Sequence, residues 1–219
     1  MTSTSNALRR KLVVVGDGAC GKTSLLCVFA LGEFPTQYEP TIFENYVAEI
    51  RLDGKPVQLA LWDTAGQEGY ERLRPLSYAQ AHVILIAFSI DSPDSLENAQ
   101  YKWSEEVRQI CGSHIPILLV GCKADLRNDP GSNPSSGFVN SEQAKVVASN
   151  IGARGYHECS SLRNEGVDNI FEAATRAAML VRGSGGGAKN GAGSEKRRRK
   201  SSGQGGKEDG SGSCKCIIL

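Results

Sequence analysis

The sequence lacks any apolar run long enough to cross a bilayer. Its longest uninterrupted runs, LVVV and VILIAF, fall far short of the ~20 residues that a transmembrane helix needs. The N-terminal segment MTSTSNALRR also lacks the apolar stretch and small-residue cleavage site of a secretory signal. We therefore expect a cytosolic chain that attaches to a membrane only covalently or peripherally.

Metal-binding cysteine patterns and a strong charge bias are missing as well. The seven cysteines form an odd set without zinc-finger spacing, which predicts reduced thiols. The formal net charge is only +1, so the composition gives no indication of a nucleic-acid partner. With 219 residues, 40% of them hydrophobic, the chain can form one well-buried α/β domain plus an appendage.

The C-terminal part contains little that could form a core. Residues 183–213 hold eleven Gly and six Ser, with no aromatic or β-branched side chain. Such a stretch cannot bury enough apolar surface to offset its ordering entropy. The sequence therefore predicts a globular domain over 8–182 and a flexible Gly/Ser-rich tail over 183–219.

What is present in the globular part is an alternation of strand and helix patterns. Continuous apolar runs predict strands buried on both faces, and Asp53-Gly54 predicts a hairpin between two more strands. The predicted strands are 12–15, 46–52, 57–62, 83–88 and 117–120. The predicted helices are 22–31, 95–111, 142–151 and 167–181. This alternation is typical of a doubly wound α/β fold with helices on both faces of a mostly parallel sheet.

A glycine-rich loop, GDGACGKT, lies between the first strand and the first helix. It matches G-x-x-x-x-G-K-[ST] over Gly16 to Thr23. In this context the backbone N–H groups and the helix N-terminus cradle a phosphate. Lys22 would reach the β and γ phosphates, and the Thr23 hydroxyl would bind Mg²⁺, which prefers oxygen ligands.

The loop alone leaves other interpretations open. Gly16, Gly18 and Gly21 also fit G-x-G-x-x-G, and Glu39 lies at about the distance of the acidic residue in a dinucleotide site. A glycine turn needed only for close packing of strand and helix is a third interpretation.

Two further motifs follow predicted strands. LWDTAGQE overlaps the end of the strand 57–62 and continues beyond it, and GCKADL directly follows the strand 117–120. In a parallel sheet both are brought to the carboxyl-end crevice where ligands bind. A dinucleotide enzyme needs neither motif, so their convergence argues against that alternative.

These motifs resemble the Ras superfamily, and more closely the Rho family of small GTPases. The resemblance covers residues 11–182 and includes YEPTIFENY, LWDTAGQEGYERLRPLSY and FSIDSPDSLEN. It implies a P-loop NTPase G domain whose six-stranded sheet is parallel except for one antiparallel edge strand. It also implies a GTP/GDP switch that uses Mg²⁺.

The resemblance implies how guanine is selected. Asp125 would accept hydrogen bonds from N1–H and the 2-amino group, donors that adenine lacks, so adenine would leave a buried carboxylate unpaired. Lys123 would lie along the base plane, and Phe34 would pack on its edge. The backbone N–H groups around Ser160 and Ser161 would meet O6.

It also implies how the γ-phosphate is sensed and cleaved. Thr41 would join the Mg²⁺ shell, Asp63 would hold the ion through water, and Gln67 would orient the attacking water. The segments 37–45 and 64–78 would be the two switches. The catalytic residues would be Gly18, Lys22 and Gln67. The nucleotide site would comprise Gly16, Asp17, Gly18, Ala19, Cys20, Gly21, Lys22, Thr23, Ser24, Phe34, Thr41, Asp63, Gly66, Lys123, Asp125, Ser160 and Ser161, with Thr23 and Thr41 as metal ligands.

Hydrolysis is expected to be slow without a partner. No catalytic arginine is evident in the sequence, and an arginine finger from an activating protein raises the rate by about 10³–10⁵ in such enzymes. Exchange factors, a GDP-dissociation inhibitor and effectors would bind through 37–45 and 64–78. The alternative is a constitutively GTP-bound signalling module, which the intact Gly18 and Gln67 disfavour. An enzyme that uses ATP is disfavoured by Asp125, which would pair with guanine.

The sequence departs from the family pattern in three places. Cys122 stands where Asn or Thr is usual, so a hydrogen bond to the phosphate loop is lost and nucleotide exchange is expected to be faster. Ser161-Leu162 replaces an Ala-Lys or Ala-Leu pair, where the contact is made by the backbone. The segment 128–140 replaces a short charged helix with Pro, Gly and Ser, which disfavours a helix. His82, His114, His157, Trp62 and Trp103 are expected to be structural, with Trp62 also near exchange factors.

The chain ends in a C-a-a-X box whose terminal Leu219 favours geranylgeranylation of Cys216. A second signal is expected, because one lipid seldom anchors stably. One candidate is Cys214, which would be palmitoylated; the alternative is that it is a free thiol. The other candidate is the basic run 196–200, which would bind anionic lipid. The alternatives for this run are nuclear import and a solvated linker. We expect the protein to lie at the cytoplasmic face of the plasma membrane, with a cytosolic pool. We also expect a role like that of fungal Rho proteins in polarity, actin organisation or cell-wall growth.

Overall fold

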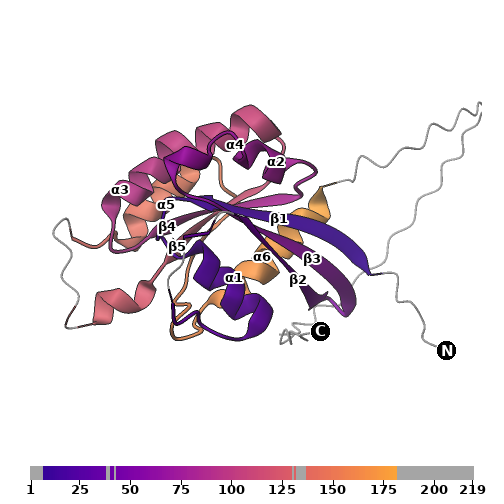
Figure 1. Ribbon diagram of the computed structural model, residues 1–219, viewed down its shortest axis with the longest axis horizontal. Coiled ribbons are helices and arrows are strands. Elements are labelled where there is room, and N and C mark those ends of the chain that lie inside the picture. Colours follow the sequence, from indigo (N-terminus) through magenta and orange to yellow (C-terminus); the bar gives the residue numbers. More distant parts are fainter. Residues whose placement is uncertain (1–6, 38–39, 42, 130, 132–136, 182–219) are drawn as a thin grey trace, which may run out of the picture.

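The protein is described by a computed structural model, which covers residues 7–37, 40–41, 43–129, 131 and 137–181 (Figure 1). Six strands form one sheet in the order β2-β3-β1-β4-β5-β6. The strands are β1 (Leu8–Gly16), β2 (Phe43–Leu52), β3 (Lys55–Thr64), β4 (Val83–Ser89), β5 (Ile117–Cys122) and β6 (Tyr156–Glu158). Only the edge pair β2 and β3 is antiparallel, which confirms the predicted fold class.

Helices cover both faces of the sheet. The α-helices are α1 (Lys22–Leu31), α2 (Arg74–Tyr78), α3 (Pro93–Asn98), α4 (Ser104–Cys111), α5 (Ser141–Asn150) and α6 (Val167–Leu180). The 3₁₀ turns are η1 (Glu68–Tyr70) and η3 (Ala124–Asn128), and η2 (Ala99–Trp103) is a π-helix. In Figure 1, α1 and α6 lie below the sheet, and α2, α3, α4 and α5 lie above it.

The helix predicted over 95–111 differs from the structure in its interior. The helical run starts at Pro93, and the π-helix η2 separates α3 from α4. A π turn adds a residue to the helical repeat, and apolar periodicity over so short a stretch does not reveal it. The short elements α2, η1, η3 and β6 were not predicted, because none is long enough to display a period.

Along the central strands, alternate side chains pack into two hydrophobic cores, one on each face of the sheet. Along β1, Leu12 and Val14 join the core beneath α1 and α6, whereas Val13 and Val15 join the core beneath α3, α4 and α5. All four side chains are fully buried. This two-sided burial explains why the strands read as continuous apolar runs.

The predicted hairpin is also confirmed. Asp53 (φ 50°) and Gly54 (φ 76°) both adopt left-handed conformations between β2 and β3. Two consecutive residues with positive φ define the turn that matches the natural twist of paired strands. The Asp-Gly dipeptide therefore set the register of the edge strand.

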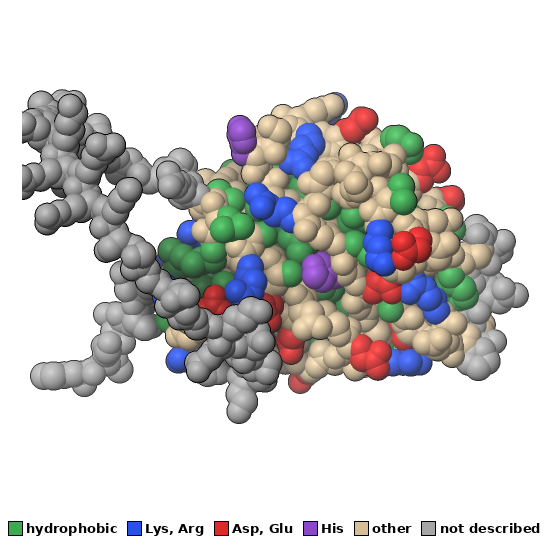
Figure 2. Space-filling view, turned by 180° about the vertical axis from the view of Figure 1, so that it is seen from behind, with side chains coloured by type: hydrophobic (Ala, Val, Ile, Leu, Met, Phe, Trp, Pro, Cys, Tyr) green, Lys and Arg blue, Asp and Glu red, His purple; other side chains and the backbone are tan. Residues whose placement is uncertain are grey.

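The remaining predictions concern thiols, membrane spans and loops. The five cysteines within the described ranges are free, as expected. In the same part of the chain, no helix is both long and apolar enough to cross a membrane. Within 128–140, the described residues after η3 are not helical, and the others lie outside the described residues. The tail, with Cys214, Cys216 and the basic run, also lies outside them. On the face seen in Figure 2, acidic and basic side chains are interspersed.

Candidate functional site

The phosphate loop connects the end of β1 to the start of α1. Gly21 occupies the N-cap of α1 with a left-handed φ of 106°. The Lys22 side chain is buried, and its Nζ donates to the carbonyl oxygens of Gly16 at 3.0 Å and Asp17 at 2.7 Å. The lysine thus folds over its own loop, at a helix N-terminus suited to an anion.

Two glycines allow the backbone to approach closely at this site. A Cβ on Gly16, where φ is 147°, would lie 2.1 Å from the carbonyl oxygen of Ala87 in β4. A Cβ on Gly66 would lie 2.4 Å from both the Asp17 carbonyl carbon and the Gly18 nitrogen. The absence of a side chain at Gly66 therefore lets the segment after β3 lie directly against the phosphate loop.

A cavity of about 420 Å³ opens beside the loop, within the size range of small-molecule sites. The predicted residues that line it are Gly18, Ala19, Gly21, Lys22, Thr23, Ser24, Phe34, Thr41, Gly66, Gln67 and Lys123. Pro35, Thr36, Gln37, Pro40 and Thr64 also line it, although none of them was predicted individually as a site residue. The cavity thus joins three strand ends, those of β1, β3 and β5, as the topology predicted.

Three oxygen-bearing side chains meet at one side of the cavity. The Thr23 hydroxyl donates to Oδ2 of Asp63 at 2.5 Å and lies 2.7 Å from the Thr41 hydroxyl. Burial raises the pKa of Asp63, although the hydrogen bond from Thr23 and the charge of Lys22 oppose that shift. Two hydroxyls and a carboxylate are hard oxygen donors, so this set fits a Mg²⁺ ion.

The segments expected to hold the base are tied to each other. The backbone N–H of Ala124 donates to the Cys159 carbonyl at 2.9 Å, and Asp125 is buried in η3. Lys123 has a left-handed φ of 62°, a strained conformation for a non-glycine residue, and it is one of the residues that line the cavity. Its Nζ lies 3.8 Å from Oδ1 of Asp91.

One expectation about the base needs correction. Ser160 is almost completely buried, and its backbone N–H donates to the Glu165 carbonyl at 3.0 Å. That bond belongs to a small antiparallel bridge between Ser160 and Glu165. The Ser160 N–H is therefore already paired, which leaves Ser161 as the residue whose N–H would meet O6.

Two loop residues face away from the cavity. The Asp17 carboxylate accepts hydrogen bonds from Nε1 of Trp103 at 2.7 Å and from Nδ2 of Asn98 at 2.8 Å. The Cys20 thiol is buried and lies 3.6 Å from the Ala87 carbonyl oxygen. Burial raises the pKa of Cys20 to about 11, so this thiol stays protonated at neutral pH. Asp17 and Cys20 shape the loop with their side chains, and neither is among the residues that line the cavity.

Cys122 lies directly under the phosphate loop. A Cβ on Gly21 would be 3.1 Å from Cβ and 3.7 Å from Sγ of Cys122, so the Cys122 side chain lies close to the backbone of Gly21. A hydrogen bond to Cys159 and burial together raise the pKa of the Cys122 thiol well above its usual range. The phosphate loop therefore rests on an apolar, neutral neighbour.

The side chains that support the site from behind were not predicted from the sequence. Trp103 was expected to be structural, and it is fully buried, but its indole N–H also holds Asp17. Two further supporting side chains were not predicted: Asn98, which also binds Asp17, and Glu106, which binds Arg74 and Tyr78. Nothing in their local sequence reveals these contacts, which arise because α3 and η2 bring Asn98 and Trp103 to the phosphate loop and α4 packs against α2.

Known proteins are similar in sequence to this chain over most of its length. Residues 11–180 match the Ras family. The chain is 65% identical over 185 residues to GTP-binding protein rho2 of Schizosaccharomyces pombe, covering 82% of this chain and 92% of that protein. It is 58% identical to GTP-binding protein RHO1 of Saccharomyces cerevisiae, covering 80% and 86%, and 56% identical to RHO2 of the same yeast, covering 82% and 94%.

Proposed function

The chain belongs to the Ras family as a Rho-type small GTPase, and on this premise we propose how its own residues operate the switch. Proteins of this family are GTPases that use Mg²⁺ with the nucleotide. The proposal rests on one observation, the convergence of Lys22, Gln67 and Lys123 from three separate strand ends on a single cavity. We propose that GTP binds there.

In this proposal each group has a separate task. Lys22 and the loop N–H groups neutralise the phosphates. Gly18 leaves room beside them, since a Cβ added there would meet only a Gln67 carbon, at 3.8 Å, among the described residues. Asp125, with Lys123 and the Ser161 N–H, selects guanine. Thr23 and Thr41 bind Mg²⁺ and Asp63 holds it through water, and the ion supplies positive charge beside the phosphates.

Hydrolysis requires a positioned water, and Gln67 is the side chain proposed to orient it. Gln67 is exposed at the rim of the cavity, where a partner can reach it. We propose that an activating protein supplies an arginine and accelerates the reaction by about 10³–10⁵. The alternative, a constitutively GTP-bound module, would require a defect in Gly18 or Gln67, and both are intact.

Loss of the γ-phosphate would release Thr41 and Gln67 together, so 37–45 and 64–78 are the proposed binding segments for exchange factors, a GDP-dissociation inhibitor and effectors. Exposed Leu73 and Leu76 give the second segment apolar contact area. We further propose a geranylgeranylated Cys216, with or without acylated Cys214, that places the protein at the cytoplasmic face of the plasma membrane. We also propose a role in polarity, actin organisation or cell-wall growth, which rests on the resemblance of the sequence to fungal Rho proteins.

The proposal is tested by measuring nucleotide choice and turnover on the purified chain. Unlabelled GDP should displace a fluorescent GDP analogue far better than ADP does, and Asp125→Ala should erase that preference. Preloaded GTP should be hydrolysed slowly by the wild type and more slowly by Gln67→Leu. Equal displacement by ADP, or hydrolysis that Gln67→Leu leaves unchanged, would refute it.

A further inference from the structure

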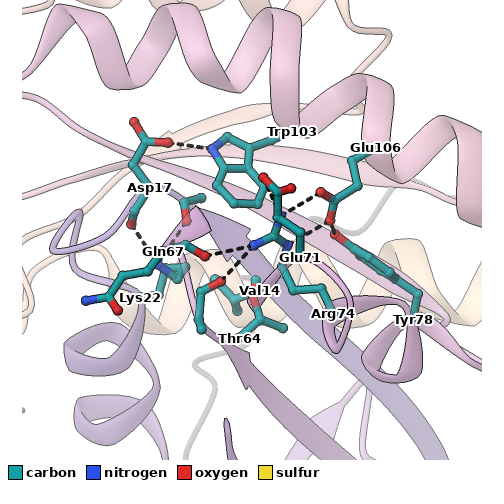
Figure 3. A network of polar contacts seen from close by, with 12 residues as sticks. Val14, Asp17, Lys22, Thr64, Gln67, Glu71, Arg74, Tyr78, Trp103 and Glu106 are labelled. Carbon is teal, nitrogen blue, oxygen red and sulfur yellow. Dashed lines mark hydrogen bonds and ion pairs between the residues drawn. The ribbon is translucent and has the colours of Figure 1, made fainter. Parts of the chain in front are cut away.

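Arg74, the first residue of α2, is a buried cation that binds backbone within the fold. Its side chain is 2% exposed. Nη1 donates to the carbonyl oxygens of Ala65 and Gln67, each at 3.3 Å. Arg74 therefore holds the backbone on both sides of Gly66, in the segment that carries Gln67 (Figure 3).

Glu106 of α4 fixes the guanidinium in this position. Its Oε1 accepts from Nε of Arg74 at 3.0 Å, and its Oε2 accepts from Nη2 at 2.9 Å. The Tyr78 hydroxyl donates to the same Oε1 at 2.6 Å. A paired, two-pronged arrangement of this kind gives directional as well as electrostatic restraint, since the planar fork fits a carboxylate in one orientation.

Trp103 connects this cluster to the phosphate loop. The Arg74 guanidinium lies over its ring, 4.8 Å from the centroid, and its indole N–H donates to Asp17. Figure 3 shows the order of these groups, from Asp17 through Trp103 to Arg74, Glu106 and Tyr78. One continuous set of contacts thus joins the phosphate loop to α2.

The π-helix η2 explains how both Asn98 and Trp103 reach one carboxylate. Residues five apart in an α-helix differ by about 140° around the axis and face different directions. A π turn, with its wider i→i+5 repeat, brings such residues to the same side. The irregular turn therefore lets helix residues 98 and 103 hold the two oxygens of Asp17.

The segment 65–67 is consequently held from two sides. Gly66 presses against Asp17 and Gly18 on one side, and the Arg74 guanidinium binds the flanking carbonyls on the other. A displacement of Arg74 would move Gln67, because the guanidinium binds the carbonyl of Gln67 itself and that of Ala65 two residues before it.

We propose that Arg74 and Glu106 are positioning residues for GTP hydrolysis, holding the 65–67 backbone so that Gln67 meets the attacking water beside the phosphate loop. This inference rests on the proposed function. The ion pair acts through Gln67 and does not touch the nucleotide. Hydrolysis should therefore depend on it more strongly than nucleotide release does.

The test measures hydrolysis of preloaded GTP in a single turnover, GDP release and thermal stability for Glu106→Gln. The variant keeps the shape of the side chain and loses its charge. We expect the hydrolysis rate constant to fall about ten-fold, because small misplacements of catalytic groups have large effects. GDP release should stay at the wild-type value, since Trp103 and Asn98 still hold Asp17.

Glu158→Gln is the matched control, because Glu158 forms a comparable half-buried ion pair with Arg127 away from Gln67. It should lower the melting temperature similarly and leave single-turnover hydrolysis unchanged. If Glu106→Gln lowers only stability, or if Glu158→Gln slows hydrolysis equally, the inference is wrong.

Two further variants keep the test decisive if Glu106→Gln folds poorly. Tyr78→Phe removes one hydrogen bond to Glu106 and should slow hydrolysis about three-fold. Arg74→Lys keeps the charge but loses the planar fork, so its hydrolysis rate should lie between those of wild type and Glu106→Gln. Wild-type rates in both would overturn the inference. A wild type that hydrolyses no GTP, or one that Gln67→Leu does not slow, would instead refute the proposed function.

Discussion

The indole Nε1 of Trp103 donates a 2.7 Å hydrogen bond to Oδ1 of Asp17, across 86 positions of sequence. A fully buried aromatic side chain therefore holds the outer carboxylate of the phosphate loop. Because the same ring lies against Arg74, the loop and α2 share one support. This relationship connects the phosphate loop with the segment that carries Gln67.

Gly66→Ala should disable the switch. The new Cβ would lie 2.4 Å from two backbone atoms of the phosphate loop, so either the loop or the 65–67 segment must move. We expect single-turnover GTP hydrolysis to fall by about 10²-fold, the scale of a 1 Å misplacement. Gly69→Ala is the control, since no atom of the described residues lies within 4 Å of a Cβ there. Hydrolysis at the wild-type rate in Gly66→Ala would show that this close approach is unimportant.

Cys122→Asn should slow nucleotide release. An amide under Gly21 can donate to the phosphate loop, whereas the thiol is a weak donor. One buried hydrogen bond contributes ~1 kcal/mol, which corresponds to about five-fold slower release of a fluorescent GDP analogue. Cys122→Ala, which adds no donor, should release it at close to the wild-type rate. If Cys122→Asn released GDP as fast as Cys122→Ala, an amide at position 122 would not stabilise the phosphate loop, and the prediction would be wrong.

Removal of Mg²⁺ should act through Thr23. Chelation with EDTA should accelerate GDP release from the wild type, because the hydroxyl pair and Asp63 then lose their shared cation. Thr23→Ala should release GDP fast already, with little further effect of EDTA. Thr41→Ala should weaken Mg²⁺ binding in the GTP form more than in the GDP form. An equal response of Thr23→Ala and wild type to EDTA would argue against Thr23 as a ligand.

The Glu106 cluster should contribute a pH-dependent stability. Burial alone would raise the pKa of Glu106, but hydrogen bonds from Arg74 and Tyr78 outweigh it and lower the pKa below 4.5. A lowered folded-state pKa stabilises the fold above pH 4.5, and that contribution is lost as the pH falls through the folded-state pKa. Urea unfolding should therefore show Glu106→Gln less stable than wild type at neutral pH. The difference should shrink below pH 4.5, and a constant difference would exclude this linkage.

Much of the fold followed from local patterns. The runs at 12–15, 83–88 and 117–120 predicted doubly covered strands because each of their side chains meets a core, and Asp53-Gly54 predicted the hairpin because both residues tolerate positive φ. The motif around Gly16 to Thr23 predicted the phosphate loop, and strand order predicted that the loops after β3 and β5 would reach the same cavity.

The tertiary structure decided what the motifs could not express. Whether the Ser160 N–H remains available depends on its bridge to Glu165, and whether Asp17 faces the cavity depends on Trp103 and Asn98 from another element. A local sequence encodes backbone preference and apolar period, which determine elements and their order. Contacts between residues far apart in the chain depend on how the helices cross the sheet, and a π turn or a buried ion pair leaves no periodic trace. The sequence by itself therefore determined the phosphate loop, the sheet and the family resemblance, and only the packing of α2 and α4 around Arg74 showed what holds Gln67.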